Sequence, residues 1–181
     1  MSARIQRHQA SAVWRQARGA LVLACSAWFA GACIERPELV VPTAAEVEGY
    51  YASVADLGVE MSGNVAVITV VQSANQLRRG GSLWAKVGPY IYLFSEETRQ
   101  LLEDFQGLAA VRVATRTAGG SEVAHAMLTR DELSDVLWRR SLNIAGQARR
   151  DGTDRPALLE DLIRWGEDHT EYEYSARYIP R

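Results

Sequence analysis

The sequence is poor in the residues and motifs that carry the commonest kinds of protein chemistry. Its 181 residues include two cysteines and three histidines. No serine lies in a Gly-x-Ser-x-Gly segment, and the glycine pair at residues 80–81 is not followed by Lys-Ser or Lys-Thr. Neither a serine-hydrolase elbow nor a phosphate-binding loop is therefore indicated. With so few ligand residues, the sequence predicts neither a metal nor a cofactor.

The N-terminal apolar run is too short to cross a membrane as a helix. Residues 19–32 are 14 uncharged, mostly apolar residues, which rise only about 21 Å as a helix, against about 30 Å of hydrocarbon core. Four arginines and no acidic residue precede this run. A basic start, a short apolar run and small residues at its end are typical of a secretory signal peptide.

The run ends in Ala30-Gly31-Ala32-Cys33, which resembles the lipobox of bacterial lipoproteins. The resemblance implies a signal peptide over residues 1–32 and a lipid on Cys33, which would become the mature N-terminus. Ala30 stands where leucine is commonest, and Ala30-x-Ala32 also fits ordinary signal peptidase, which would release the protein without lipid. After cleavage Cys33 is the only cysteine, so no intramolecular disulfide can form. Because a lone exposed thiol is a liability outside the cytosol, the cysteine count favours the lipid anchor.

The charge of the processed chain indicates which partners to expect. Of 20 basic and 22 acidic residues, four arginines lie in residues 1–32, so the other 149 residues carry 16 basic and 22 acidic side chains and a net charge of −6. Such a chain repels phosphate backbones, which excludes nucleic acid as a partner. We expect a cell-envelope protein held at the membrane through Cys33, with an envelope protein or a glycan as a further partner.

The remaining residues predict one domain after a short tether. Residues 33–42 contain two prolines and no helical period, which indicates the lipidated N-terminus and tether, and residues 43–181 form the domain. Three capping patterns predict helix starts, at Thr43, Ser95 and Thr129. Asp154, two residues before a proline, predicts a fourth. The first three helices are expected to end near glycines, at residues 58, 107 and 152, and Gly166 is expected on the inner face of the fourth.

Alternating and β-branched runs predict the strands. Residues 65–71 predict a central strand covered on both faces, and residues 59–61 pair with it through a turn at 62–64. Residues 109–117 and 122–128 predict a second hairpin. Residues 72–88 read as irregular, 90–94 as an aromatic-rich strand, and the tail 171–178 as an edge strand or an extended arm. The expected fold is α+β, with a mostly antiparallel sheet of four or five strands packed against three helices.

Two histidines remain in the processed chain. His125 lies mid-strand, where a packed and hydrogen-bonded core histidine is expected. His169 lies among acidic residues at 167–171, and its neighbours diverge by about 100° per helical step, so a solvated helix end is expected rather than a metal site.

The best candidate binding site is the glycine-containing segment around residues 78–90. Arg78, Arg79, Trp84 and Tyr90 are arginines and aromatics of the kind that carry most interface energy. The leading hypothesis is a membrane-anchored envelope lipoprotein that acts as a non-enzymatic binding or structural accessory domain. The alternative is a small envelope hydrolase or carbohydrate-active enzyme that uses acidic residues. An enzyme should bring carboxylates or His125 together in one pocket, whereas a binding module should expose Trp84 and the two arginines.

Overall fold

The computed structural model describes residues 39–179. The predicted signal peptide at 1–32, Cys33 and the tether up to residue 38 lie outside the described residues. So do the side chains of Gln76 and Arg79. The last part of the predicted tether contacts the domain, because the Gly107 amide donates to the Val40 carbonyl at 2.9 Å.

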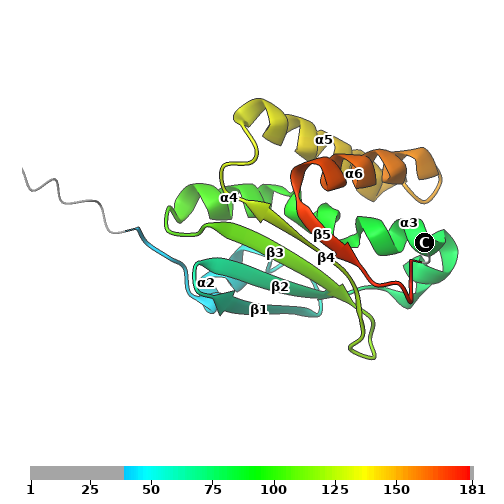
Figure 1. Ribbon diagram of the computed structural model, residues 1–181, viewed down its shortest axis with the longest axis horizontal. Helices are drawn as coiled ribbons and strands as arrows, with labels where there is room; N and C mark the ends of the chain where they lie inside the picture. Colours follow the sequence, from blue (N-terminus) through cyan, green and yellow to red (C-terminus); the bar gives the residue numbers. More distant parts are fainter. Residues whose placement is uncertain (1–38, 180–181) are drawn as a thin grey trace, which may run out of the picture. The chain divides into compact units, whose positions relative to one another are not determined.

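The domain contains a five-stranded mixed sheet in the order β1-β2-β3-β4-β5 (Figure 1). The strands are β1 (Leu57–Ser62), β2 (Val65–Val71), β3 (Ala110–Arg116), β4 (Glu122–Thr129) and β5 (Glu171–Tyr174). The β2–β3 pair is parallel and the other three pairs are antiparallel. The predicted α+β class and the mostly antiparallel sheet are confirmed, as are both hairpins and the edge strand in the tail.

Only one face of the sheet is fully buried. On β2, Ala66, Ile68 and Val70 are at most 2% exposed, whereas the side chains that alternate with them are half-buried or exposed. On that second face, Arg112 and Met127 are cross-strand neighbours and are also half-buried. The prediction that β2 is covered on both faces is therefore wrong, and its alternation is that of a sheet with one core face.

The helices are α2 (Ala44–Tyr50), α3 (Ala74–Leu93), α4 (Glu96–Asp104), α5 (Asp135–Asp151) and α6 (Pro156–His169). The chain crosses from β2 to the parallel strand β3 through α3 and α4. Helix α3 packs on β3 and β4, and α6 and α5 pack on α3 from the other side (Figure 1). Within residues 39–179 no helix combines the length and the apolar character that a membrane span requires.

The central helix α3 was not predicted from the sequence. It replaces both the irregular segment at 72–88 and the strand at 90–94. A kink at Gly81, where φ is +53°, joins two helical pieces, and a left-handed φ of this kind suits glycine. After the kink Trp84, Val87, Ile91 and Phe94 follow helical spacing and are buried. Tertiary packing therefore stabilises a helix that contains Gly88 and Pro89, and the helical geometry of α3 is interrupted at Gly81.

Three of the four predicted helix starts are confirmed and one is wrong. Thr43 and Glu46 form the reciprocal capping box of α2, and the Ser95 hydroxyl accepts from the Thr98 amide at the start of α4. Thr129, in contrast, is the last residue of β4, and α5 begins six residues later. The start predicted at residues 154–156 is confirmed, because α6 begins at Pro156, but Asp154 does not cap it: Arg155 holds the N-cap position and makes no side-chain cap bond.

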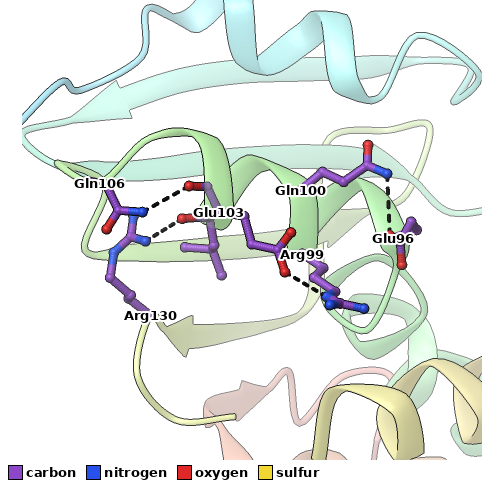
Figure 2. A network of polar contacts seen from close by, with 7 residues as sticks. Glu96, Arg99, Gln100, Glu103, Gln106 and Arg130 are labelled. Atoms are coloured by element: carbon purple, nitrogen blue, oxygen red, sulfur yellow. Dashed lines mark hydrogen bonds and ion pairs between the residues drawn. The ribbon is translucent and has the colours of Figure 1, made fainter. Parts of the chain in front are cut away.

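Arg130 connects the end of β4 to the end of α4. Its Nε donates to the Leu108 carbonyl at 2.7 Å, and its two Nη atoms donate to the carbonyls of Leu102 and Phe105. Figure 2 shows this side chain reaching the carboxyl end of α4 beside Gln106 and Glu103. One guanidinium thus satisfies carbonyls that a helix end leaves without internal donors.

Candidate functional site

A cavity of about 440 Å³ lies at the carboxyl ends of the two parallel strands. In open α/β sheets this edge is where ligands bind, because the strand ends and the following helix starts leave a crevice there. The last residues of β2 and Thr115 near the end of β3 form one side. Residues 53–55 before β1, residues of α3, and the start of α4 complete it. The lining residues are Tyr51, Ser53, Val54, Ala55, Val70, Val71, Gln72, Ser73, Trp84, Gly88, Ile91, Tyr92, Ser95, Glu97, Thr115 and Arg149.

Gln72 is the polar residue that distinguishes this cavity. It follows β2 directly, and its backbone N–H donates to the Arg116 carbonyl at 2.7 Å, which prolongs the pairing of β2 with β3. The side chain is 7% exposed. Its Nε2 donates to the Trp84 carbonyl at 2.5 Å, whereas its Oε1 is buried and accepts no hydrogen bond from the described residues. A buried acceptor without a donor costs about 1–3 kcal/mol of folding free energy, so the unpaired Gln72 oxygen calls for an explanation.

Gly88 brings α3 close to that acceptor. A Cβ placed on Gly88 would lie 3.4 Å from Gln72 Oε1 and 2.9 Å from Thr115 Cγ2. Since the second distance is shorter than real Cβ contacts, only glycine lets the helix approach the two strand ends at this point. The close approach of α3 at Gly88 thus helps to bury the Gln72 amide.

The other walls are mainly apolar. Trp84, Ile91 and Val70 are each at most 9% exposed and present carbon surface to the cavity. Arg149, from the last turn of α5, donates from Nη2 to the Ile91 carbonyl at 2.8 Å and keeps its other N–H groups free of bonds within the described residues. Apolar walls with a few convergent polar groups are the usual composition of a small-molecule site.

A hydroxyl network holds Tyr51 at the edge of the cavity. The Thr98 hydroxyl donates to the Tyr92 carbonyl at 2.7 Å, so the Tyr51 hydroxyl, 2.6 Å away, is the donor to Thr98 Oγ1. Burial raises the pKa of the Tyr51 hydroxyl, with a smaller contribution from the Glu97 carboxylate. Tyr51 therefore stays neutral and fixed at ordinary pH.

The structure separates the four residues predicted to form a binding loop. Trp84 is buried at the cavity instead of lying on an exposed face, so the expected exposure of this residue is wrong. Tyr90 is fully buried, and its hydroxyl is 2.7 Å from that of Tyr174 on β5. Arg78 is exposed and donates to Asn75 Oδ1, and the Arg79 side chain lies outside the described residues. The four residues belong to one helix rather than to a loop.

His125 lies on the half-buried face of the sheet, away from the cavity. Its Nδ1 is 2.7 Å from Glu122 Oε1 and its Nε2 is 3.9 Å from Glu173 Oε2. The side chain is 18% exposed. It is hydrogen-bonded as predicted, but its partner is a carboxylate near the open face rather than a group in the core.

A second hollow, of about 200 Å³, gathers acidic residues around His169. Its lining includes Glu132 from the β4–α5 connection and Asp168 and Glu171 from the chain on either side of His169. Nδ1 of His169 lies 3.4 Å from Glu132 Oε1, and its ring centroid is 4.2 Å from that of Trp165. The predicted solvated helix end is therefore partly enclosed. Within residues 39–179 no cluster of three or more His, Cys, Asp or Glu has the geometry of a metal site.

Sequence reasoning missed the cavity because it depends on the parallel pairing of β2 with β3, which brings Gln72 and Thr115 together across 43 positions of the chain. The available signal was the polar Gln72 immediately after the most strand-like run. Comparison of the chain with protein-family models, with curated proteins and with solved structures finds no match.

Proposed function

We propose that the chain is a lipid-anchored protein of the bacterial cell envelope whose folded domain is a non-enzymatic binding module for a small molecule. The observation that carries the binding role is the buried Gln72 Oε1 beside a cavity of about 440 Å³. That volume falls within the roughly 300–1,000 Å³ range of small-molecule sites. A bound donor would satisfy an acceptor that the protein itself leaves without a partner.

The anchoring role is supported by residues 1–33 alone: the basic start, the short apolar run, and the small residues before a cysteine. A domain tethered about 30 Å or less from the bilayer by residues 33–42 would remain close to the membrane surface. In this setting the module would bind a compound of the envelope space, with an envelope protein or a glycan as a further partner.

Metabolic labelling with palmitate tests the anchor. The wild-type chain should incorporate label and remain with membranes, whereas Cys33→Ala should lose both properties. Cys25→Ala is the matched control, because it changes the other cysteine without touching the cleavage site. Retained labelling of the Cys33→Ala variant would contradict the anchor, and the mass of the mature N-terminus would then show where the chain begins.

A second candidate function, the envelope hydrolase or carbohydrate-active enzyme, is favoured by the acidic hollow. There a histidine and three carboxylates line one concavity, and such sets can perform general acid–base catalysis. Glu132→Gln should then abolish hydrolysis of a glycoside or ester in a substrate panel and leave the thermal midpoint unchanged. Asp161→Asn, at an exposed ion pair on α6, is the matched control. Lack of hydrolysis by the folded wild-type protein would exclude this candidate.

A further inference from the structure

The chemistry of the cavity narrows the class of its ligand, an inference that rests on the proposed binding function. The lining carries one full charge of each sign, the Glu97 carboxylate and the Arg149 guanidinium. Neither belongs to an ion pair among the described residues. Arg149 is exposed and Glu97 is half-buried, so water solvates each group in the free protein, and a ligand that carries one charge of each sign can pair with both.

The two charges act on different parts of the lining. Arg149 is held over the end of α3 by its bond to the Ile91 carbonyl, and its positive charge lowers the pKa of Tyr92, although burial raises that pKa more strongly. Glu97 lies in the first turn of α4, and its negative charge contributes to the raised pKa of Tyr51. Cation and anion thus lie beside different tyrosines of the same cavity.

The neutral amide of Gln72 in the same lining has a defined polarity. Because the Trp84 carbonyl can only accept, the Gln72 amide must turn its Nε2 toward that carbonyl and keep Oε1 as the free atom. Oε1 is buried, so a ligand donor reaches it through a small shift of the Gln72 side chain; its partial negative charge favours an ammonium or N–H group and disfavours a carboxylate or a phosphate. The site therefore offers a neutral acceptor and an anion to a ligand's donor end, and a cation to its acceptor end.

We infer that the cavity binds a zwitterion of the amino-acid type, either a free amino acid or a dipeptide. Its ammonium group or amide N–H pairs with Gln72 Oε1 and Glu97, its carboxylate pairs with Arg149, and an apolar side chain contacts Trp84 and Ile91. Guanidinium groups suit this role because they bind carboxylates through two parallel hydrogen bonds. A neutral sugar would compensate neither charge, and a dicarboxylate would oppose Glu97 and Gln72.

The test is calorimetric titration of the full-length protein, purified in detergent, with defined probes. L-Leucine and glycyl-L-leucine are the zwitterions. N-acetyl-L-leucine lacks the ammonium group, L-leucinamide lacks the carboxylate, and glucose and succinate represent the competing classes. We expect at least one zwitterion to bind, and each blocked analogue of it to bind about tenfold or more weakly, the effect of one lost charge-assisted bond.

Variants assign the charges to the two ends. Arg149→Gln should weaken binding of the zwitterion about tenfold and leave the affinity for L-leucinamide unchanged. Glu97→Gln should weaken binding of the zwitterion about tenfold and leave the affinity for N-acetyl-L-leucine unchanged. Arg150→Gln and Glu96→Gln are the controls, since neither residue lines the cavity. Zwitterion binding that neither Arg149→Gln nor Glu97→Gln weakens would overturn the inference.

Two other outcomes separate the inference from the proposed function. Preferred binding of glucose or succinate, lost in Gln72→Ala, would overturn the zwitterion and leave the binding module standing. Failure of every probe to bind a protein that still unfolds cooperatively would overturn the inference, and failure of a wider panel of metabolites would overturn the binding module as well.

Discussion

The side-chain amide of Gln72 donates to the backbone carbonyl of Trp84 and thereby ties the end of β2 to the middle of α3. These residues are separated by the kink at Gly81, so the bond joins the strand to the second helical piece rather than to the adjacent one. The same bond leaves Oε1 buried without a donor at the cavity. One residue thus contributes both to the packing of the fold and to the chemistry of the candidate site.

Replacing Gln72 with glutamate should destabilise the domain. A carboxylate cannot donate to the Trp84 carbonyl, so two acceptors would face each other in a buried place, at a cost of about 1–3 kcal/mol in the free energy of unfolding. The defect should shrink at acid pH, where the introduced carboxyl becomes protonated and can donate. Urea denaturation at neutral and acid pH measures both effects. Gln147→Glu, on the exposed face of α5, should change stability by less than about 0.5 kcal/mol.

Gly166→Ala should destabilise the contact between α6 and α3. A Cβ at this position would lie 2.4 Å from Cδ1 of Tyr90, a fully buried ring that also bonds Tyr174. Overpacking of this kind costs about 1–3 kcal/mol. Gly146→Ala on α5 is the matched control, because its nearest neighbour is the flexible end of Arg150 at 3.6 Å, and helix propensity should stabilise it by about 0.5–1 kcal/mol. Equal urea midpoints for the two variants would contradict the packing described for α6.

Arg130→Ala should lower stability by more than a surface arginine does. The change removes donors from three carbonyls at the end of α4, and hydrogen bonds from a charged group contribute about 1.5–3 kcal/mol. Arg164→Ala is the comparison, since that side chain is 71% exposed and pairs only with Asp161. Such surface pairs contribute about 0–1 kcal/mol. Thermal unfolding that ranks the two variants equally would contradict the role assigned to Arg130.

Alkaline pH should remove the contribution of Tyr50 to stability. Its hydroxyl donates to Asp104 Oδ2 at 2.6 Å, and this bond, reinforced by partial burial and negative charge, raises the pKa of Tyr50 from 10.0 to about 12. A raised folded-state pKa means that the contribution is complete below pH 10 and is lost as the pH rises from 10 to about 12. The stability difference between wild type and Tyr50→Phe should therefore be constant up to pH 10 and decline above it. A difference that does not change with pH would contradict the assigned bond.

The elements that could be predicted are those whose signal is local. Three signals each depend on a few adjacent residues. They are the alternation of Val111 and Val113 with their neighbours, the glycine turns of both hairpins, and the Thr43–Glu46 capping box. Each was found where the structure has it, and together they suffice for the α+β class.

The elements that could not be predicted depend on packing between distant segments. Helix α3 contains Gly81 and Pro89, which predict a break, and its stability comes from burial against the sheet on one side and α6 on the other. The β-branched and aromatic residues at 90–94 predicted a strand because such residues are common in strands. Their helical spacing with Trp84 and Val87 was the signal to follow. Thr129 misled in the opposite way: its capping sequence lies at the end of β4, and five residues separate it from the first residue of α5, so it caps no helix.

The central proposal is that the cavity beside Gln72 holds a small molecule in the native protein. Native mass spectrometry of the full-length protein, purified from its source cells in mild detergent, tests this most directly. We predict an excess mass from one small ligand in the wild type and in Gln147→Ala, and its absence in Gln72→Ala. A folded wild-type protein without any such excess, or an equal excess in Gln72→Ala, would contradict the claim.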